Sequence, residues 1–255
     1  MLKSFELKIL TTHSLRTIRV YDPETCNEER PCDVLFMHDA QNLFDDEMSY
    51  HEVSWRVIEG LEKANVRNII VVGIDNSPTE RMNEYSPYET NIELKNRFIK
   101  GTGGKGFIYI DFIVDDVLPV IKNRYHTSEN YYMAGSSMGA YISMFAAMRY
   151  PSLFKGIGCF SISSWFNEDK FLNDLKASTF HPDTSFFISV GDQETSSDDL
   201  KDFPEIYINN SKHVFEVLEN KGIKRVSFQV VNGKHNERQW MNLFPEFIKF
   251  MIQPS

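Results

Sequence analysis

Residues 131–142 read YYMAGSSMGAYI, and Gly135–Gly139 within them match the pattern G-x-S-x-G. The residues before the pattern, Tyr131–Ala134, are strand-like, and those after it, Ala140–Ala147, are helix-like. A serine at such a junction sits on a very sharp turn, with glycines on either side to avoid Cβ clashes. The turn would present the Ser137 hydroxyl at a helix N-terminus, where free N–H groups favour a developing negative charge. The pattern predicts Ser137 as a catalytic nucleophile; a turn that merely packs a helix onto a strand is the alternative.

Strand-like and helix-like segments alternate on both sides of this motif. Residues 34–37, 68–74, 131–134, 156–161, 186–190 and 226–231 are typical of strands, and residues 107–121, 139–148, 214–218 and 240–251 have helical spacing. Two alternating segments near the start, 5–9 and 18–20, indicate an antiparallel hairpin at a sheet edge. The order predicts an α/β fold, a three-layer sandwich with a mostly parallel central sheet and an antiparallel N-terminal edge. We expect residues 1–255 to form one domain, since no repeat or hinge-like linker interrupts the pattern.

Composition excludes several classes of function. The chain of 255 residues has 27 Lys and Arg against 36 Asp and Glu, a net charge of −9, which argues against binding to nucleic acid or anionic membranes. It shows neither a signal-peptide core nor a run of about 18 apolar residues, so we expect a cytoplasmic protein. The three cysteines, Cys26, Cys32 and Cys159, are odd in number and form no CxxC pair. A disulfide framework and a structural zinc site are therefore not expected. The oligomeric state stays open.

A serine hydroxyl needs an imidazole to take its proton, and the imidazole needs a carboxylate to fix its tautomer. On a fold with this motif the chain order is serine, acid, histidine, each on a loop after a strand. Of the seven histidines only His235 directly follows the last strand-like segment. His38 also ends a central strand, but it precedes the serine. Position therefore predicts His235 as the base, with a surface loop histidine as the alternative.

The acid is expected in the loop after the segment Phe186–Val190, which reads GDQET. Glu194 is the first choice and Asp192 the reserve. Asp198 and Asp199 lie further from the end of the strand and are less favoured. Chain order predicts the loop but leaves the identity of the carboxylate open.

The backbone N–H of Met138, directly after the serine, is the first expected donor of an oxyanion hole. The second donor is expected in the loop 38–45, from the N–H of Gln41 or alternatively of Ala40. His38 and Asp39 in that loop are interpreted as structural, because no third metal ligand accompanies them; neither a metal nor a cofactor is expected.

Four residues near the expected ends of central strands are candidates for the wall of a substrate pocket. They are Ala40, Ser136, Trp165 and Phe166. For Trp165 and Phe166, packing into the core is an equally good interpretation.

At this point the sequence resembles the esterase D/enterochelin-esterase-like family of serine esterases, over nearly the whole chain. The resemblance is carried by Met37–Asp45, Arg81 with Glu84–Pro87, Tyr109–Phe112, Gly135–Gly139, Gly191–Glu194, and His235–Glu237 with Trp240. It implies the α/β-hydrolase fold and a carboxylic-ester hydrolase that works without a metal. By that match Ser137 is the nucleophile, His235 the base and Glu194 the orienting acid. Where the family often has glycine in the first oxyanion loop, this chain has Ala40.

The sequence thus predicts a serine esterase that forms an acyl-enzyme on a small ester with a short acyl, carbohydrate-linked or siderophore group. Two alternatives stay open: an acyltransferase of the same fold, and a catalytically silent module that only binds. An anionic catecholate siderophore would need cationic side chains at the pocket, for which Arg81, Lys105 and Arg238 are candidates. The acidic net charge disfavours such a substrate.

Overall fold

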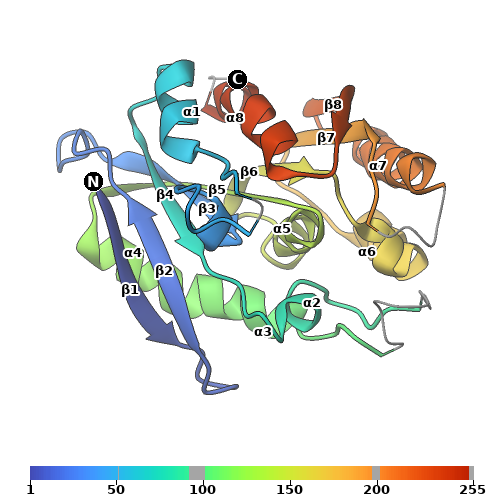
Figure 1. Cartoon of the computed structure of the whole chain (residues 1–255), viewed down its shortest axis with the longest axis horizontal. Helices are drawn as coiled ribbons and strands as arrows, with labels where there is room; N and C mark the ends of the chain where they lie inside the picture. Colours follow the sequence, from blue (N-terminus) through green and yellow to red (C-terminus); the bar gives the residue numbers. More distant parts are fainter. Residues whose placement is uncertain (51, 92–100, 197–201, 253–255) are drawn as a thin grey trace.

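The computed structural model describes residues 1–50, 52–91, 101–196 and 202–252, and an eight-stranded sheet runs through its centre (Figure 1). The strands are β1 (Leu2–Lys8), β2 (Leu15–Tyr21), β3 (Cys32–His38), β4 (Ile69–Ile74), β5 (Thr127–Ser136), β6 (Phe154–Phe160), β7 (Ser185–Gln193) and β8 (Arg225–Lys234). Their order is β1-β2-β4-β3-β5-β6-β7-β8. β1 and β2 pair antiparallel, as do β2 and β4, and the other neighbours are parallel. The expected mostly parallel sheet with an antiparallel N-terminal edge is confirmed.

Helices cover both faces of the sheet. α1 (Val57–Ala64) and α8 (Glu237–Ile252) pack together on one face, along the upper side of Figure 1. The other face carries α3 (Gly106–Asp111), the π-helical turn η2 (Phe112–Val117), α4 (Leu118–Arg124), α5 (Met138–Arg149), α6 (Glu168–Ala177) and α7 (Phe203–Asn220). Short helices η1 (Ala40–Asn42), α2 (Arg81–Glu84) and η3 (Ser164–Asn167) lie in loops. No helix within the described ranges has the length and apolar character needed to cross a membrane.

Two separate cores explain why the central strands are apolar on both faces. Successive side chains of a strand point to opposite sides. In β3, Val34 and Phe36 therefore belong to the core beneath α3–α7, and Leu35 and Met37 to the core beneath α1 and α8. All four are at most 1% exposed. This double burial is what a parallel sheet covered by helices requires.

Parallel strands all end at the same edge of the sheet, so the loops that follow them meet there. The residues brought to this edge are Asp39–Asn42 after β3, Ser137 after β5, Ser161–Trp165 after β6, Glu194 after β7 and His235 after β8. Segments separated by up to about two hundred positions in the chain thus share one end of the molecule.

The structure contains one disulfide that the sequence did not indicate. Cys26 and Cys32 form a disulfide with a Cα–Cα distance of 5.4 Å, in the connection between β2 and β3. The odd number of cysteines argues against a framework of several disulfides but not against one bond that closes a short loop. Cys159 remains a free, buried thiol, and burial raises its pKa above the ordinary value.

Candidate active site

Ser137 forms the sharp turn between β5 and α5. Its φ of 56° and ψ of −120° are outside the regions that a non-glycine residue ordinarily adopts. Backbone hydrogen bonds fix the turn: the Ser137 N–H donates to the Phe160 carbonyl (2.8 Å), and the Tyr141 N–H donates to the Ser137 carbonyl (3.1 Å). The predicted succession of strand, turn and helix is confirmed, and such backbone strain is typical of functional positions.

The two glycines of the motif are not equivalent. A Cβ added at Gly135 would lie 2.7 Å from the carbonyl carbon of Gly139 and 3.0 Å from its Cα, so only glycine fits there. A Cβ at Gly139 would meet no atom closer than 3.4 Å, the Cβ of His38. The close approach of strand and helix behind Ser137 therefore depends on Gly135.

His235 directly follows β8, and its Nδ1 lies 2.5 Å from Oε2 of Glu194. The Glu194 side chain is fully buried. Its other oxygen, Oε1, accepts hydrogen bonds from the Gly191 N–H (2.7 Å) and the Ser161 hydroxyl (2.5 Å). Because the carboxylate accepts at Nδ1, that nitrogen of the neutral ring carries the proton and Nε2 is left as a hydrogen-bond acceptor.

The reserve acid, Asp192, has a different role. It is exposed, and its carboxylate accepts the Gly233 N–H and the Asn232 amide, both at 3.1 Å. The Gly233 amide is the main cause that lowers the pKa of Asp192. Asp192 thus holds the end of β8 through these hydrogen bonds, whereas Glu194 contacts the His235 ring. Asp198 and Asp199 lie outside the described residues.

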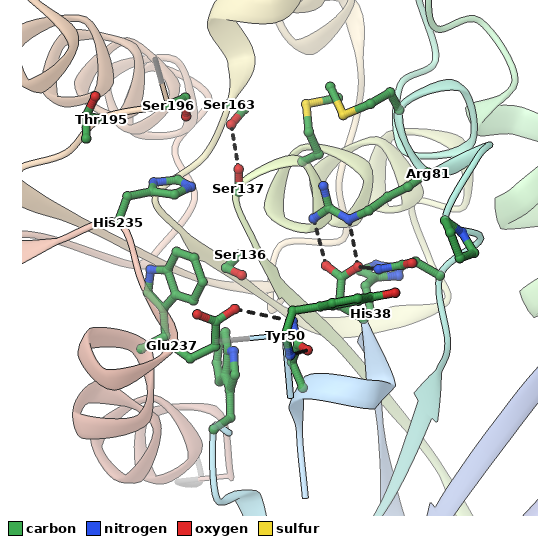
Figure 2. Close-up of a pocket in the computed structure, with 18 of the residues that line it drawn as sticks. His38, Tyr50, Arg81, Ser136, Ser137, Ser163, Thr195, Ser196, His235 and Glu237 are labelled. Atoms are coloured by element: carbon green, nitrogen blue, oxygen red, sulfur yellow. Dashed lines mark hydrogen bonds and ion pairs between the residues drawn. The ribbon is translucent and has the colours of Figure 1, made fainter. Parts of the chain in front are cut away.

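A pocket of about 840 Å³ opens at this end of the sheet, and both Ser137 and His235 line it (Figure 2). The other lining residues are His38, Asp39, Asn42, Tyr50, Trp55, Asn76, Pro78, Arg81, Met82, Ser136, Met138, Ser163, Trp165, Thr195, Ser196, Glu237 and Trp240. The volume is of the size that holds a small-molecule ligand.

The Ser137 hydroxyl points to Ser163 in the structure, with the two Oγ atoms 3.1 Å apart (Figure 2). Ser163 in turn lies 3.0 Å from the hydroxyl of Tyr207 on α7. The Tyr207 ring also flanks His235, at 5.0 Å between ring centroids, and Trp240 meets the same imidazole edge to face at 5.1 Å. Among the hydrogen bonds of the described residues, Ser137 pairs with Ser163 and not with His235. A hydrogen bond between Ser137 and His235 would therefore have to form before the serine proton could pass to the imidazole.

The structure separates the other predicted site residues into two groups. Met138, Ser136 and Trp165 line the pocket. Ala40 and Phe166 are buried, at 1% and 0% exposure, and do not line it, so their place is in the packing behind the wall.

Gln41 is not among the lining residues either, although its neighbours in the loop, Asp39 and Asn42, are. The Gln41 side chain accepts the Asn76 N–H at 3.2 Å, which ties the loop after β3 to the loop after β4.

Four further contacts in this region were not anticipated from the sequence. They are the support of Glu194 by Ser161, the contact of Ser163 with Ser137, the hydrogen bond from Asn42 to Glu237 (3.2 Å), and the ion pair of Arg81 with Asp39 (2.7 Å). Ser161 is the last residue of a predicted strand and Ser163 follows two residues later, which was the only available signal for them. The described residues contain no group of three or more His, Cys, Asp or Glu side chains placed to hold a metal ion.

His38 is a buried, neutral link between three elements rather than a ligand or a base. The Ser143 hydroxyl donates to the Gly139 carbonyl (2.8 Å), so it accepts from His38 Nε2–H (3.1 Å). Nδ1 therefore accepts from the Tyr109 hydroxyl (2.8 Å). Burial lowers the pKa of His38 to about 3, an effect that the nearby Asp39 opposes and Arg81 reinforces.

This burial predicts a loss of stability in mild acid. The unfolded chain takes up a proton at His38 near pH 6.5 and the folded protein only near pH 3, so the free energy of unfolding should fall as the pH drops below 6.5. The contribution of His38 is at most about 1.4 kcal/mol per pH unit. Urea unfolding at pH 7 and pH 5 should show a shallower decline for His38→Gln than for the unaltered protein. Equal declines would show that His38 is not the group responsible.

Comparison with known proteins places this chain in a family. Residues 11–251 match the model of the family described as "Putative esterase". The chain is 27% identical over 192 residues to the uncharacterized protein YbbA of Bacillus subtilis, which covers 74% of this chain and 71% of YbbA.

Two solved structures show the same fold. The BES protein from Bacillus cereus has a TM-score of 0.76 at 16% identity and covers 99% of this chain and 96% of its own. Siderophore hydrolase EstB from Aspergillus nidulans has a TM-score of 0.70 at 19% identity and covers 100% and 97%. With the family match over nearly all of its length, the chain belongs to the Putative esterase family, carboxylesterase-type enzymes with the α/β-hydrolase fold.

Proposed function

We propose that the protein is a serine carboxylic-ester hydrolase in which Ser137 is the nucleophile, His235 the general base and Glu194 the orienting acid. The observation that carries this is the 2.5 Å contact between His235 Nδ1 and the buried Glu194 carboxylate, in a pocket that Ser137 also lines. A carboxylate at Nδ1 leaves Nε2 free to accept a proton from a hydroxyl. Ser137, at the strained turn, is the hydroxyl that fits this role.

The reaction follows from these positions. Ser137 Oγ turns from Ser163 towards His235, loses its proton to Nε2 and bonds to the ester carbonyl carbon. The backbone N–H of Met138, at the start of α5, stabilises the oxyanion. We assign the second donor to the N–H of Gln41: Gln41 is not itself among the residues that line the pocket, but it lies between Asp39 and Asn42, which are. The imidazolium then protonates the leaving alcohol as its C–O bond breaks. Water repeats the sequence on the acyl-enzyme, and the acid leaves with Ser137 restored.

The substrate that we propose is a small ester with a short acyl, carbohydrate-linked or siderophore group. The volume of about 840 Å³ and the mixture of aromatic and polar lining residues suit a ring-bearing molecule of modest size. Ser136 and Trp165 would contact it. EstB, a siderophore hydrolase, has the same fold, which keeps a siderophore ester among the substrates to be tested.

A fluorophosphonate probe tests the assignment of the nucleophile. We expect one adduct, and peptide mass spectrometry should locate it on Ser137 and not on the neighbouring Ser136 or Ser163. Labelling should require the folded protein, since an isolated serine is not nucleophilic. An unlabelled Ser137 in the folded protein would favour a silent binding module. Added alcohols that appear as new esters among the products would indicate acyl transfer instead of hydrolysis.

The cytoplasmic location stays a prediction. The disulfide between Cys26 and Cys32 argues against it, because such bonds persist mainly in oxidising compartments.

A further inference from the structure

Asp39, the first residue after β3, has a left-handed backbone conformation. Its φ is 56° and its ψ is 49°, values that few residues other than Gly, Asn and Asp adopt. The residue is 7% exposed, and the next three residues, Ala40–Asn42, form η1. The conformation of Asp39 therefore sets the direction in which the η1 backbone leaves the sheet.

Hydrogen bonds reach every polar group of Asp39. Arg81 Nε donates to Oδ1 (2.7 Å) and Arg81 Nη2 to Oδ2 (2.8 Å), so the guanidinium grips the carboxylate with two parallel bonds (Figure 2). The Asn76 side-chain amide also donates to Oδ1 (2.5 Å). The Asp39 N–H donates to the Tyr85 hydroxyl (3.1 Å), and the Asp39 carbonyl accepts the Asn42 N–H (2.8 Å). Three of these partners, Asn76, Arg81 and Tyr85, come from the single segment that runs from the end of β4 to the residue after α2.

The charges of the pair are stable at neutral pH. Burial opposes ionisation of Asp39, but the Arg81 guanidinium outweighs it and lowers the pKa of the carboxyl. Burial likewise opposes the charge of Arg81, and Asp39 raises its pKa. Arg81 also lies over the Tyr85 ring, 4.9 Å from the centroid, which restricts the guanidinium from a second side. The planar guanidinium of Arg81, restricted in this way, orients the Asp39 carboxylate more firmly than a lysine ammonium could.

We propose that Arg81 and Asp39 are positioning residues for the esterase reaction: their ion pair holds Asp39 in its left-handed conformation and thereby positions the Gln41 N–H of η1 for the oxyanion. The inference rests on the proposed function, because it needs an oxyanion beside Ser137. Asp39 and Asn42 at the two ends of this short segment both line the pocket. A displacement of an oxyanion donor by about 1 Å is enough to lower a rate by about 100-fold.

A competing role for Arg81 is direct recognition of substrate. Its side chain is 27% exposed and lines the pocket, so its guanidinium could contact an anionic group of an ester. The two roles differ in what they change. Positioning affects the reaction of every ester equally and appears in kcat, whereas recognition affects anionic esters alone and appears in KM.

The test compares Asp39→Asn and Arg81→Lys with the unaltered protein on 4-nitrophenyl acetate and on the anionic mono-4-nitrophenyl succinate. Asparagine tolerates the left-handed conformation, so Asp39→Asn removes the charge while keeping the shape. We expect kcat to fall by about 10- to 100-fold on both esters, with KM nearly constant. The affinity for a trifluoromethyl ketone, which places its hemiketal oxygen in the oxyanion position, should weaken by the same factor as kcat/KM. The double variant should be no worse than the worse single variant, since both remove one interaction.

The matched control is Asp111→Asn. Asp111 is held by Arg149 through the same pair of bonds, at 2.5 and 2.7 Å, but on α3 and away from the pocket. This variant should keep kcat. If Asp39→Asn is unfolded at the assay temperature, Tyr85→Phe leaves the ion pair intact and removes the acceptor of the Asp39 N–H, together with the hydrogen bond between the Tyr85 and Tyr109 hydroxyls. It should lower kcat by a few-fold.

Two results would overturn the inference: an unchanged kcat in folded variants, or a loss confined to KM for the succinate ester. Failure of the proposed function would look different, because then the unaltered protein itself would not react with a fluorophosphonate at Ser137.

Discussion

Replacing Ser137 by alanine is expected to lower kcat for 4-nitrophenyl acetate by at least about 10³-fold. The substitution removes the atom that would bond to the acyl carbon, and the remaining imidazole and backbone amides can only assist attack by water. Residual activity from such a site is small because nucleophile and base act as a unit. KM should change little, since the hydroxyl contributes little to binding of the ground state.

Ser152→Ala is the matched control, because Ser152 is exposed and outside the pocket. It should have the kcat of the unaltered protein. Steady-state hydrolysis followed at 400 nm, with the concentration of folded protein determined for each preparation by absorbance and circular dichroism, makes the comparison. Turnover retained in Ser137→Ala would remove the serine from the mechanism, whatever the fold.

The second large effect is expected for Glu194→Gln, with a decrease in kcat of about 10³- to 10⁴-fold. The glutamine amide can donate to His235 Nδ1, which would move the ring proton to Nε2. Nε2 then has no lone pair for the Ser137 proton, although the geometry is preserved. The loss should arise from the wrong tautomer and not from unfolding, so the thermal midpoint should move much less than the rate.

Asp192→Asn separates the two acids that the sequence leaves open. Its carboxylate is exposed and holds the Gly233 N–H and the Asn232 side chain, so its kcat should stay within a few-fold of the unaltered value. A large loss in Asp192→Asn with a mild one in Glu194→Gln would reverse the assignment.

Local patterns were enough to predict the mostly parallel sheet and the order, along the chain, of the loops that carry the candidate residues. A run that is apolar on both faces, such as 34–37, is typical of a strand covered by helices on both sides when helix-like segments alternate with it. The parallel order of such strands then brings the loops that follow them to one edge. Residues at the ends of strands could therefore be predicted to lie at this edge. Ser137, His235 and Glu194 are such residues, since each directly follows the last residue of a strand.

Features that depend on the direction of one side chain in a loop could not be predicted. Trp165 and Phe166 are neighbours after β6, yet Trp165 lines the pocket and Phe166 is buried in the core. No periodicity exists in a loop to tell them apart. Ala40 was predicted for the wall of the pocket, but its side chain is buried. The left-handed residue before it, Asp39, changes the direction of the chain at this point.

Contacts between distant segments could not be predicted from the sequence either. Arg81 and Asp39 are 42 positions apart, and Ser161 and Glu194 are 33 apart. Each is an ordinary polar residue in the sequence, and only the fold brings the pairs together. The bond between Cys26 and Cys32 was missed because a count of cysteines says nothing about whether two of them face each other across a short loop.

The chain has three tryptophans, and all of them, Trp55, Trp165 and Trp240, line the pocket. The tryptophan fluorescence of the protein, excited selectively over its tyrosines, therefore originates entirely at the site where a ligand would bind. Indole emission is sensitive to the polarity and the quenchers beside the ring, so a molecule that enters and displaces solvent there changes the whole signal. Occupancy of the pocket can be titrated on the native protein without any label, even with compounds that are never turned over.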